Sequence, residues 1–209
     1  MVNIPSNLKP ILVGIIISDA WLQINKAGNT RLAFKQSIDK LEYFLYVFKQ
    51  LSHYCSAYPH LTKTNLNGKT FYGISFSTRS YPCFTELYQI FYNKSIKIVP
   101  SNLYEILTWE ALAHWICCDG TRTYNGITLQ TQSFTIKEVA FIVNVLILKF
   151  NLKCSIHMQR GQPTIYISSK SMEKIQAHIL PYFCHSMRYK LFINNNSEVA
   201  NSREVLRLE

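Results

Sequence analysis

Two aspartates stand at matching places in the chain, and each one closes an apolar segment. Asp19 comes shortly after the apolar run Ile11 to Ile17, and Asp119 ends the segment that starts at Leu112. The two acids lie 100 positions apart in a chain of 209 residues, and a small residue follows each of them. Such a repeat predicts that the two carboxylates serve one shared purpose.

A carboxylate at the end of a buried helix is unfavourable for two reasons. The helix C-terminus carries partial negative charge, and an unpaired buried carboxylate costs much free energy. The plain alternative is that each acid is an exposed residue at a helix end. Paired carboxylates that bind Mg²⁺, a hard cation that prefers oxygen ligands, would explain both copies at once. We therefore interpret Asp19 and Asp119 as a metal-binding pair.

The elements around each aspartate follow the same order. Hydrophobic periodicity and turn residues predict a helix, a hairpin, a helix, a second strand pair and a further helix, followed by a basic loop. This αββαββα series, read twice, predicts an α+β fold of two pseudo-symmetric halves at residues 1–99 and 100–193, with a short tail helix at 194–209. In the first half we expect a hairpin at 21–37, a helix at 40–52, a strand at 70–77 and a final helix at 83–92. In the second half the hairpin is expected at 121–134, the helix at 136–150, the strand at 164–169 and the final helix at 172–181.

Two helix starts carry the spacing of a capping box, in which an N-cap oxygen and a glutamate three residues later satisfy free backbone amides. They are Asp39 with Glu42 and Thr135 with Glu138. The sequence therefore predicts helices that begin directly after Asp39 and Thr135.

The composition favours a folded, basic protein. Lysine and arginine number 22 against 12 aspartates and glutamates, a net charge of +10, and 48% of the residues are apolar. A surface poor in acid suits a polyanionic partner, although a generic basic protein has the same balance. The longest apolar run has seven residues, whereas a membrane span needs about 20, so we expect no membrane span. The six cysteines include no C-x-x-C pair, which argues against a zinc ribbon and for a reducing compartment.

The two motifs, Leu12 to Ala20 and Leu112 to Gly120, resemble the paired motifs of LAGLIDADG homing endonucleases, in the branch that carries both motifs in one chain. His114 and Cys118 depart from the family pattern at positions three and seven of the second motif, and we expect His114 to be a packed residue rather than a ligand. Four further segments are similar to the yeast mitochondrial intron-encoded member: 97–102, 130–135, 163–167 and 187–191.

The resemblance implies that the motif helices pack side by side at a pseudo-twofold axis, beneath antiparallel sheets that form a DNA-binding saddle. Asp19 and Asp119, with the backbone carbonyls of Ser18 and Cys118, would bind two or three Mg²⁺ ions. Mn²⁺ would substitute, and Ca²⁺ would bind without supporting cleavage. Two-metal sites stabilise both the attacking and the leaving oxygen.

Lys97 and Lys190 occupy the basic positions that the family places near the active centre. The resemblance implies that they polarise the solvent shell or stabilise negative charge that develops at the phosphate. The alternative for each is an ordinary solvated lysine. Both follow the last helix of their half, which favours the functional interpretation.

The two sheets would lie along the major groove, where donors and acceptors distinguish all four base pairs. Strand alternation puts Arg31, Ala33 and Lys35 on one face, opposite Leu32 and Phe34, and puts Gln130 and Gln132 opposite Leu129 and Thr131. Each candidate contact is nearly as compatible with solvated surface. The candidate DNA-binding residues are Arg31, Lys35, Lys69, Arg79, Arg122, Gln130, Gln132, Arg160 and Lys170.

The resemblance implies a site-specific homing endonuclease. It would act as a monomer on an asymmetric double-stranded DNA target of about two helical turns and make Mg²⁺-dependent double-strand breaks with short 3′ overhangs. Two alternatives stay open: an intron-encoded RNA maturase that binds its intron RNA, and a sequence-specific DNA binder that does not cut. Both acids are present, which favours cleavage. We expect an organellar protein, mitochondrial in the first place, with the chloroplast as the alternative.

Overall fold

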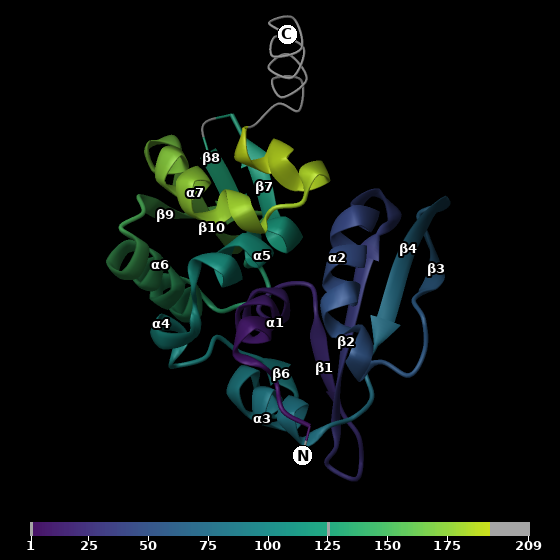
Figure 1. Ribbon diagram of the computed structural model, residues 1–209. Coiled ribbons are helices and arrows are strands. Elements are labelled where there is room, and N and C mark those ends of the chain that lie inside the picture. The colour runs from purple at the N-terminus through teal and green to yellow at the C-terminus, as the bar shows by residue number, and fades with distance from the viewer. Residues whose placement is uncertain (1, 125, 193–209) are drawn as a thin grey trace, which may run out of the picture.

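The computed structural model describes residues 2–124 and 126–192, so the tail helix predicted at 194–209 lies outside the described residues. It confirms the α+β fold. Two four-stranded antiparallel sheets flank a central pair of helices, and their strand orders are β1-β2-β4-β3 and β7-β8-β10-β9. The two orders match strand for strand, which is the pseudo-symmetry that the repeat predicts (Figure 1).

The first half carries its elements in the predicted order, with a small hairpin after the last helix. The elements are α1 (Lys9–Ile16), β1 (Trp21–Ile24), β2 (Thr30–Ser37), α2 (Leu41–Leu51), β3 (His60–Leu66), β4 (Lys69–Ser77), α3 (Pro82–Phe91), β5 (Tyr92–Asn93) and β6 (Ile96–Lys97). Short 3₁₀ helices lie at η1 (Ser6–Leu8), η2 (Ile38–Lys40) and η3 (Ser52–Tyr54).

The second half repeats the series after a short connecting helix, and a 3₁₀ helix takes the place of the last small hairpin. The elements are α4 (Leu103–Ile106), α5 (Trp109–Asp119), β7 (Gly120–Thr123), β8 (Gly126–Leu129), α6 (Ile136–Phe150), β9 (Cys154–Gln159), β10 (Gln162–Ser168), η4 (Ser169–Ser171), α7 (Met172–Ile179), η5 (Leu180–Tyr182) and η6 (His185–Leu191). The division predicted between residues 99 and 100 falls in the connection that leads to α4.

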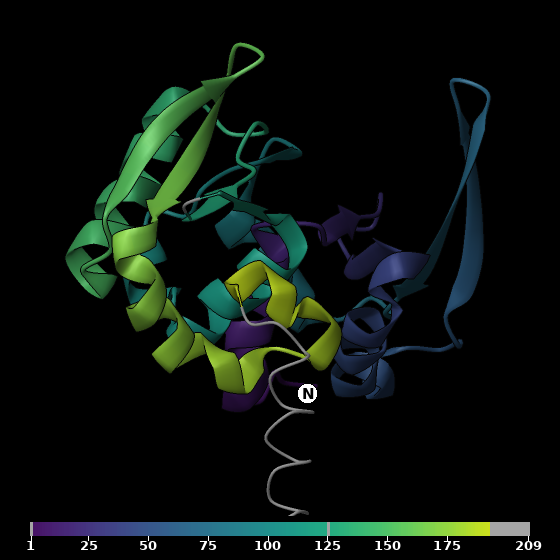
Figure 2. The same ribbon diagram turned by 90° about the horizontal axis from the view of Figure 1, so that it is seen from above.

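The two sheets rise from the central helices as the sides of a saddle (Figure 2). The β3–β4 and β9–β10 hairpins project as two separate arms, and α1 and α5 lie between the two halves. Helices α2 and α3 cover the convex face of the first sheet, while α6 and α7 cover that of the second. The concave faces of both sheets therefore point toward the same open side of the molecule.

Burial follows from the strand alternation. Leu32 and Phe34 are fully buried in the core, whereas Arg31 is exposed and Lys35 half-buried on the other face of β2. The core is one continuous cluster that includes both motif helices and the inner faces of both sheets. Among the described residues, every helix is too short or too polar to span a lipid bilayer.

The two capping predictions have opposite outcomes. Thr135 caps α6, and Glu138 completes the capping box as predicted. The box at Asp39 is wrong, because the Ser37 hydroxyl accepts from the Asp39 amide and starts a 3₁₀ turn instead. Glu42 accepts hydrogen bonds from the backbone amides of His185 and Ser186, at 3.2 and 2.9 Å, and so joins the two halves.

Strand β8 is shorter than the predicted hairpin. It ends at Leu129, so Gln130 and Gln132 lie beyond the strand, but the expected alternation holds: Leu129 and Thr131 are buried, and the two glutamines are half-buried. The buried Thr131 hydroxyl donates to the carbonyl of Pro163 at 2.9 Å, and the backbone then turns toward α6.

Candidate active site between the two motif helices

The two motif helices approach each other closely at Gly14. A Cβ atom built on Gly14 would stand 2.6 Å from the Cβ of His114 and would also collide with the backbone carbonyl of Ala111. Glycine is the residue that permits such a backbone approach. The crossing brings the ends of α1 and α5, and with them the two motif acids, to the centre of the molecule.

Asp119 is the last residue of α5, and Asp19 follows α1 after a short turn. Burial, together with the negative charge of Asp19, raises the pKa of Asp119 to about 7. The two carboxylates are therefore close enough to repel each other in a partly dry site. A bound divalent cation would relieve this repulsion.

Gln36 is a polar residue on the core face of β2, and it points at one of the acids. Its Nε2 donates to Oδ2 of Asp19 at 2.6 Å. The sequence analysis did not select Gln36. The signal was available, because the alternation that buries Leu32 and Phe34 also places position 36 on the core face.

Both predicted lysines donate to backbone carbonyls at or just after the end of a motif helix, although not to corresponding carbonyls of the two motifs. Nζ of Lys97 donates to the carbonyls of Ser18 and Ala20, both at 2.8 Å. Nζ of Lys190 donates to the carbonyls of Ile116 and Cys117, at 3.0 and 2.7 Å. Each ammonium group thus satisfies carbonyls at a helix C-terminus and offsets the negative end of the helix dipole, beside the acid.

Burial makes both lysines weaker bases. It lowers the pKa of Lys97 and of Lys190 to about 8, although the negative charges of the two aspartates oppose the shift at Lys97. Lys190 is only 3% exposed. Neither residue is the solvated surface lysine of the alternative interpretation.

Lys40 is a third lysine at the centre, and the sequence analysis did not select it. It ends η2 in the first half, but its Nζ donates to the carbonyl of Cys118 in the second half at 2.9 Å. Its positive charge lowers the pKa of Asp119 and that of Lys190. The N-cap position of α6, which follows the hairpin of the second half as Lys40 follows that of the first, holds Thr135.

The oxygens at the centre are two carboxylates and the carbonyls of Ser18 and Cys118, and each of these carbonyls also accepts a hydrogen bond from a lysine, Lys97 or Lys40. Such a set fits Mg²⁺, which binds to one or two carboxylates and keeps several waters. Within the described ranges, no group of three or more histidine, cysteine or acidic side chains gathers to hold a metal. A cation here would complete its shell from carbonyls, water or substrate oxygens.

His114 is packed in the core, as predicted. It is fully buried, its Nδ1 lies 3.0 Å from the Tyr43 hydroxyl, and its ring stacks near those of Tyr43 and Tyr46. Burial lowers the pKa of His114 to about 4. Sγ of Cys118 is buried between the Tyr43 hydroxyl, at 3.6 Å, and Nε2 of Gln36, at 3.8 Å.

The candidate DNA-binding residues gather in several places. Lys35 lines a cavity of about 340 Å³ together with Asp19, Gln36 and Lys40. The face of the first sheet that carries Lys35 is therefore continuous with the active centre. A second cavity of about 580 Å³ is lined by Gln130, Gln132, Gln159, Arg160 and Gln162. The sequence analysis did not select Gln159 and Gln162, which face each other across the β9–β10 pair.

The remaining candidates lie apart from these cavities. Lys69 is the first residue of β4, next to the β3–β4 turn, whereas Arg79 and Lys170 follow the C-terminal ends of β4 and β10. Arg31 donates from Nε to the side chain of Gln23 at 2.8 Å. Arg122 pairs in register with Ile127, whose side chain is in the core.

Arg122 therefore lies on the other face of the second sheet from the open side of the saddle. Its guanidinium donates to the carbonyl of Tyr189 at 3.4 Å and stands 4.3 Å from the ring centroid of Phe192. These contacts join β7 to the η6 region.

Comparisons with known proteins agree with this geometry. A model of the LAGLIDADG DNA endonuclease family matches residues 9–175. The chain is 34% identical over 188 residues to the cytochrome b mRNA maturase bI2 of Debaryomyces hansenii, covering 87% of this chain and 72% of that one. It is 37% identical over 157 residues to the intron-encoded endonuclease ai4 of Dictyostelium discoideum, covering 71% and 99%. The homing endonuclease I-WcaI, solved bound to its DNA recognition sequence, superposes with a TM-score of 0.87 at 27% identity, covering 93% of this chain and 89% of that one.

Proposed function

The chain belongs to the LAGLIDADG DNA endonuclease family and is a DNA endonuclease, and from this premise we propose that it makes Mg²⁺-dependent double-strand breaks with short 3′ overhangs in a long asymmetric target. The observation that carries the proposal is the meeting of Asp19 and Asp119, one from each half, where burial and mutual repulsion raise the pKa of Asp119. Two acids held against repulsion favour a cation site over a structural role.

The side chains around the acids divide the work. Asp19 and Asp119 would hold Mg²⁺, and the carbonyls of Ser18 and Cys118 would assist where Lys97 and Lys40 leave them free. Gln36 fixes the orientation of the Asp19 carboxylate through its 2.6 Å hydrogen bond. Bound Mg²⁺ supplies Lewis-acid stabilisation of phosphate oxygens and lowers the pKa of coordinated water. Mn²⁺ substitutes for it, and Ca²⁺ occupies the site without supporting cleavage.

Lys97 and Lys190 supply positive charge to the site. Each holds its ammonium group at the end of a motif helix, close to the acids, and stabilises the negative charge that develops on the phosphate during cleavage. Lys40 adds a third positive charge on the side of Asp119. The motif acids and the lysines thus form one catalytic group contributed by both halves.

The saddle holds the DNA. The halves, at residues 1–99 and 100–193, each bind one side of a target of about two helical turns, and the protein acts as a monomer because one chain supplies both sheets. Lys35, Gln130, Gln132 and Arg160 line cavities on this side and are the strongest base-contact candidates. Arg31, Lys69, Arg79 and Lys170 are candidates for phosphate contacts. Arg122 is exposed but lies on the other face of the second sheet from the open side of the saddle, so we do not propose it as a base contact.

The relatives also bear on cellular location and on a second candidate function. One of them is named a cytochrome b mRNA maturase, and another an intron-encoded endonuclease. We propose an organellar, in the first place mitochondrial, origin. The maturase name favours RNA binding in support of splicing as the second candidate, and one chain can carry both functions.

The experiment that tests the endonuclease is cleavage of a long AT-rich DNA library with Mg²⁺, with Ca²⁺ and with Mn²⁺, followed by sequencing of the ends. Discrete double-strand breaks with uniform 3′ overhangs, supported by Mg²⁺ and Mn²⁺ but not by Ca²⁺, would support the proposal. Asp119→Asn is the matched control and is expected to bind the recovered target without cutting it. Unchanged cleavage by Asp119→Asn would contradict the metal assignment.

A further inference from the structure

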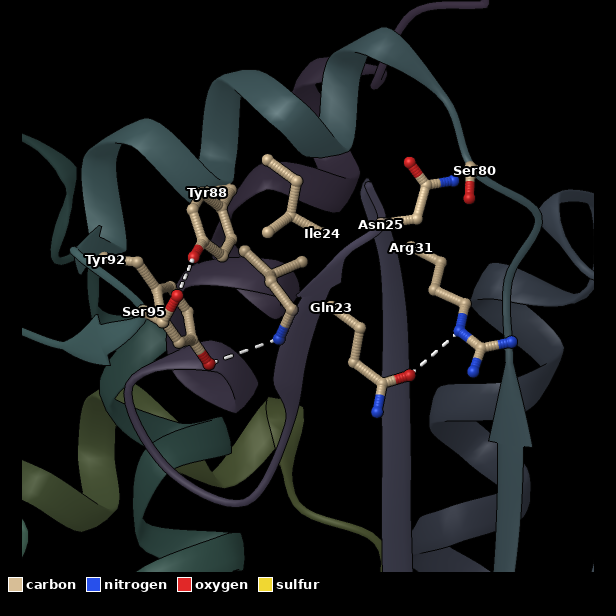
Figure 3. A pocket seen from close by; sticks show the side chains of 9 residues that line it. Gln23, Ile24, Asn25, Arg31, Ser80, Tyr88, Tyr92 and Ser95 are labelled. Atoms are coloured by element: carbon tan, nitrogen blue, oxygen red, sulfur yellow. Dashed lines mark hydrogen bonds between the residues drawn. The ribbon is translucent and has the colours of Figure 1, made fainter. Parts of the chain in front are cut away.

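A cavity of about 550 Å³ lies beside β1, apart from the motif acids (Figure 3). Its walls come from the β1–β2 hairpin, from the loop before α3, from α3 itself and from the β5–β6 hairpin. None of the residues proposed above for the catalytic group lines it. The lining residues are Leu22, Gln23, Ile24, Asn25, Arg31, Ser80, Tyr88, Tyr92 and Ser95.

Two tyrosines form one wall of the cavity. The rings of Tyr88 and Tyr92 are stacked, with centroids 4.7 Å apart and planes inclined by 6°. The Tyr92 hydroxyl accepts from the amide of Leu22 at 3.2 Å, and the Tyr88 hydroxyl donates to Oγ of Ser95 at 3.2 Å. Both rings are half-buried and are fixed at their far ends by these bonds. The wall is therefore a rigid aromatic surface.

The opposite wall is polar. Arg31 and Gln23 lie side by side and are joined by the 2.8 Å hydrogen bond from Nε, which orients the planar guanidinium. Oδ1 of Asn25 accepts hydrogen bonds from two backbone amides of the hairpin turn. The side-chain nitrogen of Asn25 is therefore the group that could donate to a ligand in the cavity. The wall combines guanidinium and amide groups, which are the side chains that form hydrogen bonds with base edges.

The charge around the cavity suits a polyanion. The lining contains no acidic residue. Three exposed basic residues stand next in sequence to lining residues: Lys26 beside Asn25, Arg79 beside Ser80, and Lys94 beside Ser95. The segments that form the cavity therefore carry exposed positive charge and bring no acid to its lining.

We propose that this cavity binds an unpaired base of an RNA strand, stacked on the tyrosine wall and hydrogen-bonded to the Gln23–Arg31 wall. Sequence-specific proteins recognise RNA mostly through unpaired bases stacked on aromatic rings and bonded along their edges. Duplex DNA keeps its bases stacked and paired, so it offers no base to such a pocket. The inference rests on the second candidate function, RNA binding, and is independent of DNA cleavage.

One lining residue connects the cavity to the saddle. Arg31 lies on the same face of β2 as Lys35, which leads to the active centre. A base that occupies the cavity would engage Arg31 and withdraw it from contact with duplex DNA. RNA and target DNA therefore compete for this end of the first sheet.

The test is fluorescence anisotropy with labelled single-stranded RNA probes of uridine only and of adenosine only, about 12 nucleotides long and so within the range of known single-strand sites. Tyr88→Leu keeps an apolar side chain but removes the aromatic face. We expect it to weaken RNA binding by about 5-fold to 150-fold, the effect of losing one stacked base. Tyr88→Phe keeps the face, and Tyr58→Leu changes an 88% exposed tyrosine far along the chain. Both controls are expected to bind as the wild type does.

Three results would overturn the proposal: no binding of either probe by the wild type, equal binding by Tyr88→Leu, or tighter binding of the matching single-stranded DNA. The last result would assign the cavity to an unpaired base of DNA. Cleavage of the duplex target is measured in parallel and is expected to survive in Tyr88→Leu. If the wild type does not cleave DNA but its RNA binding depends on Tyr88, that result would contradict the proposed endonuclease activity and leave the RNA proposal standing.

Discussion

Lys40 crosses from the first half to the second, where its Nζ donates to the carbonyl of Cys118 at 2.9 Å. This contact makes the active centre unequal, since Thr135 stands at the N-cap of α6 in the second half and carries no charge. The positive charge of Lys40 acts on Asp119. The two phosphates that the centre would cleave therefore meet different surroundings.

This inequality predicts unequal cleavage of the two DNA strands. Lys40→Met should slow one strand on the order of tenfold, less than the loss of a direct oxyanion donor, because Lys40 acts through Cys118 and through its charge. Nicked plasmid should then accumulate before the linear product. Lys49→Met, which changes an exposed lysine in the helix that follows Lys40, is the control and should leave both rates unchanged. Equal slowing of both strands would argue against this prediction.

The close crossing at Gly14 predicts that one added methyl group is costly. Gly14→Ala would force the Cβ against His114 and the Ala111 carbonyl, so the helices must separate. We expect a loss of about 1–3 kcal/mol in the free energy of unfolding, together with loss of cleavage as the acids move apart. Lys9→Ala, at the exposed start of α1, should change the free energy by less than about 0.5 kcal/mol. Urea unfolding of both variants tests the difference.

The raised pKa of Asp119 predicts that the acid pair costs stability at high pH. Its pKa is about 7 in the folded protein against an ordinary 3.8, so the folded state binds more protons between these values and stability falls as the pH rises through this window. At pH 8 without divalent cations, Asp119→Asn should be more stable than the wild type, by a few kcal/mol at order of magnitude. At pH 4 the difference should vanish. Added Mg²⁺ should stabilise the wild type and not the variant, and urea unfolding with EDTA or Mg²⁺ measures both effects.

The lowered pKa of His114 predicts the opposite pH dependence of the free energy of unfolding. Its pKa is about 4 in the folded protein against an ordinary 6.5, so the unfolded state binds more protons between these values and stability is lost as the pH falls from 6.5 to 4. The contribution is on the order of 3 kcal/mol. His114→Phe should flatten this part of the curve, and the Tyr43 hydroxyl keeps the carbonyl of residue 114 as an acceptor. An unchanged slope in the variant would contradict the assignment.

The sequence allowed the elements and the motif acids to be predicted because both depend on local patterns. Periodicity located α6 to the residue, and the repeat of an apolar run closed by an acid located Asp19 and Asp119. Lys97 and Lys190 were placed by resemblance, and the structure brings each to the end of a motif helix. These residues lie on or directly after regular elements.

The remaining site residues depend on contacts between distant segments. Lys40 donates to the carbonyl of Cys118, 78 positions away in the sequence, and no sequence spacing predicts a contact over such a separation. The Asp39 capping prediction failed because Ser37 starts a 3₁₀ turn there, and Glu42 instead accepts from backbone amides of the other half. Arg122 was a candidate DNA contact on its charge alone, and the sequence did not give the register that pairs it with the core residue Ile127. Of these residues, only Gln36 could have been found by the strand alternation that also predicted the burial of Leu32 and Phe34.

Gly14 and His114 hold the same rank in their two motifs, since each lies five residues before its aspartate, and they face each other across the crossing. The contact is therefore a matched pair of unlike residues. Two first halves would set glycine against glycine and leave a void, whereas two second halves would set histidine against histidine where one partner now has no side chain. The crossing thus favours pairing of a first half with a second half over pairing of two like halves. If the first half were replaced by that of another two-motif protein, the new half would need a small residue opposite His114.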